Sequence, residues 1–143
     1  MSARYINSAD VAARLAMVTG WMNRRIRHAG GGLSHGSLSA LASVSKAGSI
    51  RLADLAAREF VSAPSITRLV ADLEKRGLVT RKVDGQDRRA FLIEATNAGE
   101  NALVAAHAKR AILVTQLLQD LNPAELAAVA DALPALERAI ENI

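Results

Sequence analysis

Short hydroxyl side chains and one arginine lie close together between residues 62 and 68 of the chain. Ser62, Ser65 and Thr67 can donate hydrogen bonds to phosphate oxygens, and Arg68 can bind the O6 and N7 atoms of a guanine through two hydrogen bonds. Arg68 follows Ser65 by three residues, so on a helix the two side chains lie on the same face. These residue types at this spacing indicate contact with double-stranded DNA.

A second basic group, DGQDRR, occupies residues 84–89. Its glycine and aspartates predict a turn, so the arginines are expected at an exposed tip. An arginine on such a tip can enter a narrow minor groove, where the negative potential of DNA is enhanced. We expect Asp87 to orient a neighbouring arginine by a salt bridge. The alternative is that Asp87, Arg88 and Arg89 only keep an exposed loop soluble.

The elements around these residues are predicted to be a short helix, a tight turn, a second helix and a β-hairpin. The short helix carries Leu55 and Ala56 and ends near Phe60. Ser62 is the expected N-cap of the second helix, and Pro64 is tolerated in its first turn. The buried stripe of the second helix is predicted to be Ile66, Leu69, Val70 and Leu73, with Gly77 at its end.

The predicted hairpin pairs residues 78–83 with residues 90–93, and places Val79, Arg81 and Val83 on one face. A helix followed by a tight turn, a second helix and such a hairpin makes a winged helix-turn-helix. In a helix-turn-helix, the N-terminal residues of the second helix meet base edges in the major groove.

Helical patterns flank this region on both sides. A first helix is predicted over residues 8–29, capped by Ser8 and ended by the glycines at 30–32, and a second begins at Ser34 and stops near Gly48. Thr96 begins a long helix that reaches about residue 120. Asn122-Pro123-Ala124-Glu125 begins a last helix, in which Pro134 is expected to cause a kink. Its heptad-like apolar seam consists of Leu126, Val129, Leu133, Leu136, Ile140 and Ile143.

Charge is distributed unevenly along the 143 residues. Residues 1–90 hold 15 Lys/Arg and 7 Asp/Glu, a net charge of +8, whereas residues 91–143 hold 3 and 7, a net charge of −4. A basic first part suits a polyanionic partner. The absence of cysteine excludes disulfides and thiolate metal sites, and no apolar stretch is long enough to span a membrane, so we expect a cytoplasmic protein without a membrane partner.

Three stretches of the sequence resemble the MarR family of bacterial regulators: LADLA at 52–56, PSITRLV at 64–70 and LEKRGLVTR at 73–81, followed by DRRA at 87–90. The later TNAG at 96–99 resembles the helix start that follows the wing in this family. One departure is Ala95, where the family commonly has leucine.

The resemblance implies a mainly α fold with a small β-hairpin wing, made of a winged helix-turn-helix lobe at 33–94 and a helical dimerisation lobe at 1–30 and 95–143. It also implies a homodimer on a pseudo-palindromic operator, usually a repressor released by a small-molecule effector. The recognition helix would contact DNA through Ser62, Ala63, Ser65, Thr67 and Arg68. Arg89 would enter the minor groove, Asp87 would brace it, and Arg88 would contact the DNA backbone.

The helices outside the DNA-reading unit need partners of their own. The seam at 126–143 calls for a partner helix, either within the chain or in a second copy, and the resemblance favours the second copy. A dimer would place two recognition helices roughly 34 Å apart, one turn of DNA. Met17, Trp21 and Met22 are candidates to line an effector pocket, with core packing as the alternative.

Other functional classes are less well supported by the residues. The chain contains no metalloprotease, phosphate-loop or nucleophile-elbow motif, so we do not expect an enzyme. His28, His35 and His107 are too scattered to indicate a metal site, and no cofactor is expected. A non-specific architectural DNA-binding protein and a winged-helix interaction module remain as alternatives.

Overall fold

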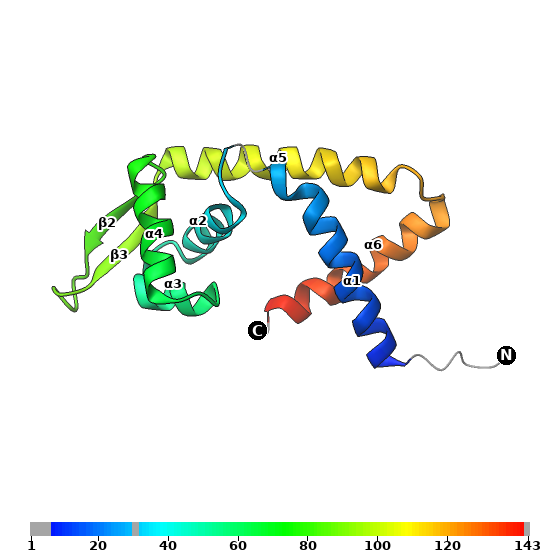
Figure 1. Cartoon of the computed structure of the whole chain (residues 1–143), viewed down its shortest axis with the longest axis horizontal. Coiled ribbons are helices and arrows are strands. Elements are labelled where there is room, and N and C mark those ends of the chain that lie inside the picture. Colours follow the sequence, from blue (N-terminus) through cyan, green and yellow to red (C-terminus); the bar gives the residue numbers. More distant parts are fainter. Residues whose placement is uncertain (1–6, 30–31, 142–143) are drawn as a thin grey trace.

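The computed structural model describes residues 7–29 and 32–141 (Figure 1). Its elements are α1 (Ser8–Ile26), the 3₁₀-helix η1 (Arg27–Ala29), α2 (His35–Ala47), β1 (Ile50–Arg51), α3 (Leu52–Arg58), α4 (Ala63–Lys75), β2 (Val79–Val83), β3 (Phe91–Ala95), α5 (Asn97–Leu118) and α6 (Pro123–Glu141). The order confirms the predicted mainly α fold with a small β-hairpin wing.

Figure 1 shows two lobes joined by α5. One lobe contains α2, α3, α4 and the β-hairpin, and α5 leads from it to the corner where α6 turns back. Helix α1 runs from beside the middle of α5 across α6. The hairpin of β2 and β3 projects from the first lobe on the side away from α1 and α6. The parts of the chain expected to contact DNA therefore lie together at one end of the molecule.

A single hydrophobic core holds the first lobe together. Its buried side chains are Leu38, Ala40, Leu41, Val44, Ile50, Leu55, Ala56, Ile66, Val70, Leu73, Val79, Ile93, Leu103 and Ala106. The predicted stripe of α4 is confirmed, with Leu69 partly buried and the other three residues fully so. Leu103 and Ala106 belong to α5, so the first half of that helix is part of this core.

Helix starts follow local capping chemistry. Ser34, Ser62 and Thr96 accept hydrogen bonds from backbone N–H groups of their helices, as predicted. Asn122 and Glu125 form a reciprocal capping box at 2.9 Å in both directions. The predicted Ser8 cap is wrong: Asn7 caps α1, because its side-chain oxygen reaches the N–H of Ala9.

Several boundaries differ from the sequence prediction. The helix predicted over 8–29 tightens to a 3₁₀ turn after Ile26. By contrast, α6 is one helix with Pro134 inside it, as predicted, and the kink there stays a prediction. Gly30 and Gly31, expected to end the first helix, and Ile143, the end of the predicted seam, lie outside the described residues. The turn between α3 and α4 depends on Phe60, which is 84% exposed and has a φ of 54°, a conformation more usual for glycine.

The sheet has three antiparallel strands in the order β1-β3-β2. The predicted hairpin is present, with Val79 opposite Ala95 and Val83 opposite Phe91. Val79 is buried and Arg81 is half-buried, but Val83 is 57% exposed, so the predicted inner face ends before the tip. Strand β1, which is two residues long, was not predicted; it pairs with β3 through Ile50 opposite Ile93.

The start of α5 is fixed against the turn between α4 and β2. The Thr96 hydroxyl donates to the carbonyl of Gly77 at 2.6 Å, and the Thr96 N–H donates to the carbonyl of Leu78 at 3.0 Å. The Gly99 N–H in turn donates to the Thr96 hydroxyl at 3.1 Å. A Cβ atom on Gly99 would lie 2.0 Å from the Leu78 carbonyl oxygen, so only glycine permits this approach.

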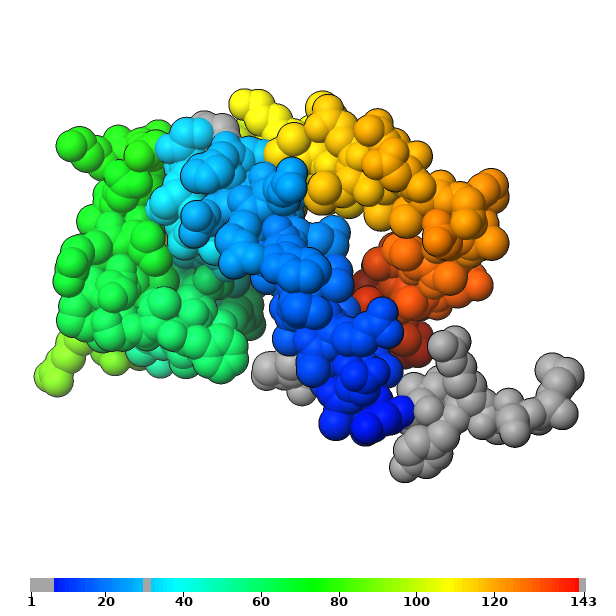
Figure 2. Space-filling view, turned by 45° about the vertical axis from the view of Figure 1, so that its right-hand side comes forward, coloured from blue at the N-terminus to red at the C-terminus, as the bar shows by residue number. Residues whose placement is uncertain are grey.

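The helices of the second lobe bury little within one chain. No residue of α1 or α6 is buried, although both helices carry apolar stripes. The exposed apolar side chains include Val11, Leu15, Met17, Val18 and Trp21 of α1, and Leu126, Val129, Leu133, Leu136 and Ile140 of α6. In Figure 2, α1 runs down the front of the molecule, partly in front of α6, and an opening separates α6 from α5.

We predict that Gly99→Ala lowers the free energy of unfolding by about 1–3 kcal/mol, because the added methyl group would displace the Leu78 backbone. Urea unfolding followed by circular dichroism measures this. Gly36→Ala is the matched control. Gly36 also lies in a first helical turn, but its Cβ would make ordinary contact with Leu69 at 3.6 Å. We expect that substitution to leave stability unchanged or to raise it by up to about 1 kcal/mol. Equal effects at the two positions would contradict the steric argument.

Candidate nucleic-acid interface

Helix α4 presents the predicted recognition residues on its outer face. Ser62 is the N-cap, and Ser62, Ala63, Thr67 and Arg68 are all exposed, whereas Ser65 is half-buried. The buried stripe of Ile66, Val70 and Leu73 fixes the rotation of the helix about its axis. The structure therefore places Ser62, Ala63, Thr67 and Arg68 on a surface that DNA could reach.

The hydroxyl groups on this helix are partly committed to local hydrogen bonds. The Thr67 hydroxyl donates its proton to the carbonyl of Ala63 at 2.7 Å. In this arrangement Thr67 can accept a hydrogen bond but has no proton left for a phosphate oxygen. The hydroxyl oxygens of Ser62 and Ser65 lie 2.9 Å apart, so one hydroxyl donates a hydrogen bond to the other. The proton of the accepting hydroxyl stays available to a ligand.

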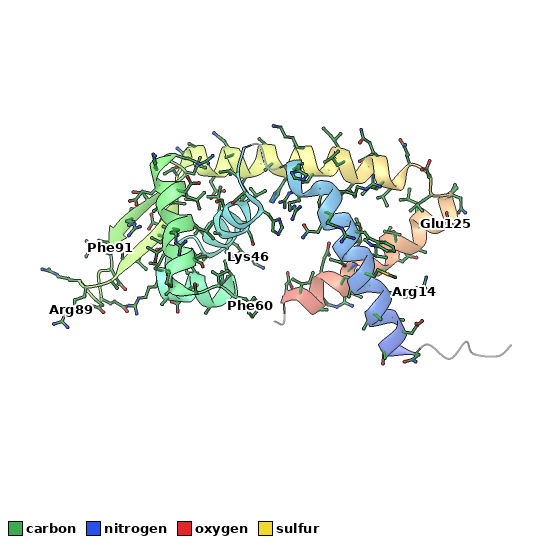
Figure 3. All side chains as sticks on the ribbon, in the orientation of Figure 1. Arg14, Lys46, Phe60, Arg89, Phe91 and Glu125 are labelled. Carbon is green, nitrogen blue, oxygen red and sulfur yellow. The ribbon has the colours of Figure 1, made fainter. Side chains whose placement is uncertain are left out.

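Basic side chains near α4 and the hairpin divide into paired and unpaired groups. The paired ones are Arg51 with Asp84, Arg76 with Asp72, Arg81 with Glu74, and Lys82 with Glu94. Within residues 7–29 and 32–141, the guanidinium groups of Arg68, Arg88 and Arg89 form no ion pair. Figure 3 shows Arg89 at the hairpin tip, extended away from the rest of the chain. Arg68, Arg88 and Arg89 are exposed as well as unpaired within these ranges, so an anionic partner could reach all three.

Asp87 acts differently from the sequence prediction. Its carboxylate accepts a hydrogen bond from the backbone N–H of Arg89 at 3.0 Å, and its carbonyl accepts one from Ala90 at 2.9 Å. The expected salt bridge to a guanidinium group is not formed. An aspartate in a turn accepts most readily from the N–H two residues later, so Asp87 shapes the loop through the backbone.

Asp84, which the sequence analysis treated only as part of a turn, is the buried charge of the wing, with 5% of its surface exposed. One oxygen accepts from the Gln86 N–H at 2.9 Å, and the other accepts from the Nε and Nη2 atoms of Arg51. The Gln86 N–H first, and Arg51 second, lower the pKa of the Asp84 carboxyl below its ordinary value. The same pair raises the pKa of Arg51. Asp84 therefore stays ionised through the neutral range, and its stabilising effect disappears only as the pH falls through this lowered pKa.

The proposed effector residues lie on α1. Trp21 and Met22 line an open hollow of about 540 Å³ together with Val18, Arg24, Arg25 and Leu117. Met17 does not line this hollow and is 48% exposed. The hollow combines apolar walls with two arginines, a lining suited to an apolar anion.

In the part of the chain that the structure describes, no group of three histidine, aspartate or glutamate side chains is arranged to hold a metal ion. None of the described helices is both long and apolar enough to cross a membrane.

Comparison with known proteins decides the family. The profile of the MarR family matches residues 33–91. An HTH-type transcriptional regulator of Mycobacterium tuberculosis is 31% identical over 135 residues, which cover 91% of this chain and 94% of that protein. The chain belongs to the MarR family. Its α3 and α4 are therefore the helix-turn-helix of a MarR-family transcriptional regulator, and β2 and β3 are its wing.

Two other comparisons agree with this assignment. The HTH-type transcriptional repressor MdtR of Bacillus subtilis is 27% identical over 110 residues, which cover 77% of this chain and 71% of that repressor. The apo structure of MarR from Escherichia coli superposes with a TM-score of 0.80 at 20% identity, covering 93% of this chain and 98% of that one. The second match establishes the shared fold.

We predict that Arg89→Ala weakens binding to duplex DNA about ten-fold or more, because one charge-assisted hydrogen-bonding group is lost. Fluorescence anisotropy with a labelled duplex measures the affinity. The thermal midpoint should stay unchanged, because the exposed Arg89 side chain forms no ion pair with the described residues. A fall in the midpoint without a change in affinity would make Arg89 a structural residue.

Proposed function

We propose that this protein is a sequence-specific, dimeric transcriptional repressor that binds double-stranded DNA and is released by a small-molecule effector. One observation carries the DNA-binding part: Arg68 on α4 and Arg88 and Arg89 on the wing lack carboxylate partners within the described residues, while four neighbouring cations are paired. Unpaired arginines on two elements of one lobe match the two grooves of a duplex.

Each element has a distinct role in this proposal. Arg68 reads a guanine edge in the major groove, where two parallel hydrogen bonds distinguish that base from the others. Ser62 and Ser65, which have one free hydroxyl proton between them, and the backbone N–H groups at the start of α4 bind phosphate. Ala63 and Thr67 contribute close contact, and Thr67 serves as an acceptor. Arg89 enters the minor groove while Arg88 contacts the DNA backbone.

A homodimer is proposed from the uncovered helices. The α6 seam has Leu126, Val129, Leu133 and Leu136 exposed by 36–47%, and Ile140 by 72%. Such contiguous apolar stripes on α1 and α6 are more than a soluble monomer usually exposes. A second copy would cover both helices by two-fold symmetry and present two recognition helices to successive turns of DNA.

Effector control is proposed from the hollow between α1 and α5. Its lining residues Trp21 and Met22 come from α1 and Leu117 comes from α5, so a ligand bound there would contact both helices. Since α5 also enters the core of the DNA-binding lobe, a shift of α5 would change the spacing of the two recognition helices. The relative MdtR is named a repressor, which favours repression over activation for this chain.

The decisive experiment selects bound sequences from a random duplex library at physiological salt. We expect an inverted repeat with half-sites about one DNA turn apart. Arg68→Ala should cost about 1–3 kcal/mol on the selected site and little on random DNA. Binding without enrichment would instead support a non-specific architectural protein. Equal weakening on all sequences would remove the base-reading role of Arg68.

The dimer is tested separately by sedimentation velocity. We predict that Leu133→Glu weakens the free energy of dimerisation by about 3 kcal/mol or more and so shifts the protein to monomers. The substitution would leave an unpaired charge in the interface. Ala135→Glu is the control, since at 3.6 residues per turn it lies on the opposite side of α6 from the seam. Dimers that persist in Leu133→Glu would place the interface elsewhere.

A further inference from the structure

The Arg51–Asp84 ion pair connects two parts of the DNA-binding lobe that are 33 residues apart. Arg51 lies in the edge strand β1, and Asp84 directly follows β2, the edge strand on the other side of the sheet. The Arg51 Nε atom lies 2.8 Å from Oδ2 of Asp84, and Nη2 contacts the same oxygen. Since β3 lies between the two strands, the arginine side chain reaches across the sheet to the root of the wing loop.

Asp84 also organises the wing loop itself. Its N–H donates to the carbonyl of Ala90 at 3.0 Å, which closes the loop 84–90, and its second oxygen accepts from the N–H of Gln86. The side chain is only 7% exposed, although residues 85–89 are all exposed. A buried carboxylate at the base of an otherwise solvated loop is an anchor for that loop, because its charge requires these particular partners.

The pair is also the loop's link to the helix-turn-helix. Arg51 immediately precedes Leu52, the first residue of α3, and α3 packs on α4. Among the described residues, no other side-chain hydrogen bond or ion pair joins loop 84–90 to another element. The direction of the wing tip relative to the recognition helix therefore depends on this contact and on the strand pairing beneath it.

We propose that Arg51 and Asp84 are positioning residues that hold the wing loop so that Arg89 reaches the minor groove at the same time as α4 occupies the major groove. This role rests on the proposed function. Arg51 and Asp84 lie outside the recognition surface. On this proposal they raise the affinity for DNA indirectly, by holding Arg89 in place. An untethered wing would keep Arg89 but would lose free energy in ordering the loop on each binding event.

A double-mutant cycle tests this coupling on the duplex selected from the random library. Anisotropy titrations compare the wild type, Asp84→Asn, Arg89→Ala and the double variant. We expect Asp84→Asn alone to weaken binding about five-fold or more, and to weaken it much less when Arg89 is already absent. If the two fold-changes multiply, or if Asp84→Asn leaves the affinity unchanged, the positioning role is wrong.

A matched control uses the ion pair between the two strands of the hairpin, Lys82–Glu94. Glu94→Gln removes the same unit of charge and breaks the Lys82–Glu94 pair, but this pair joins strand to strand and does not touch the loop. We expect its effect to multiply with that of Arg89→Ala. Non-multiplicative behaviour in both cycles would indicate a general charge effect and would overturn the specific assignment.

Arg51 requires a separate test, because its side chain is 44% exposed and could contact phosphate directly. If it acts by positioning, Arg51→Gln should weaken binding as Asp84→Asn does, and should add little in the Asp84→Asn background. If Arg51→Gln instead weakens DNA binding by the same factor in the wild type and in the Asp84→Asn variant, Arg51 contacts DNA directly. That outcome would refute the positioning role of Arg51.

Amide hydrogen exchange provides a readout that does not depend on DNA. In Asp84→Asn the Gln86 and Ala90 amides should exchange at least about ten-fold faster, while the amides of Ile66 and Val70 in the core of α4 keep their protection. Unchanged loop exchange would show that Asp84 does not anchor the wing. A wild-type protein that binds no duplex would refute the proposed function, whereas wild-type binding with multiplicative variants would refute only the positioning role.

Discussion

The close approach of α5 to the backbone of Leu78 is the contact on which the arrangement of the two lobes depends. The Thr96 hydroxyl accepts a hydrogen bond from the Gly99 N–H and donates one to the Gly77 carbonyl. One threonine therefore caps α5 and binds the turn at the end of the recognition helix. Gly99 permits the approach because it has no Cβ. Strand β2 and helix α5 therefore both begin beside the turn that ends the recognition helix, joined there by the hydrogen bonds of Thr96.

Charge pairing separates six arginines of the DNA-binding lobe into two kinds. Arg51 and Arg81 contact carboxylates of other elements in their lobe and so hold elements together, whereas Arg76 pairs with Asp72 within α4. Arg68, Arg88 and Arg89 remain unpaired among the described residues, so no competing carboxylate there must be displaced before they bind a phosphate or a base. A basic surface alone would not separate the two kinds, because a net charge counts both equally.

The second lobe follows a different physical rule. Helices α1 and α6 have apolar stripes as regular as those of the core, but no residue of either is buried within one chain. The apolar surface that stabilises the DNA-binding lobe is covered internally, whereas that of α1 and α6 is available to another molecule. This division is what a regulator needs if its DNA-reading lobes are to keep their fold while the distance between them changes.

Local features of the chain were predictable because they depend on residues within one helical turn. The caps at Ser34, Ser62, Thr96 and Asn122, the buried stripe of α4 and the exposed positions of Arg68 and Arg89 all follow from spacing and side-chain chemistry. The left-handed turn at Phe60 did not follow, because the usual glycine signal is absent there.

The sequence by itself determined the order of the helices and of the hairpin, and the exposed arginine-bearing surface that we propose binds DNA. Only the tertiary structure decided that Asp84, and not Asp87, carries the ion pair of the wing, and that Ile50 and Arg51 form a strand. Two residues are too few to show a strand period. The partner of Asp84 lies 33 residues earlier in the chain and is brought to it only when β1 and β2 pair on opposite sides of β3.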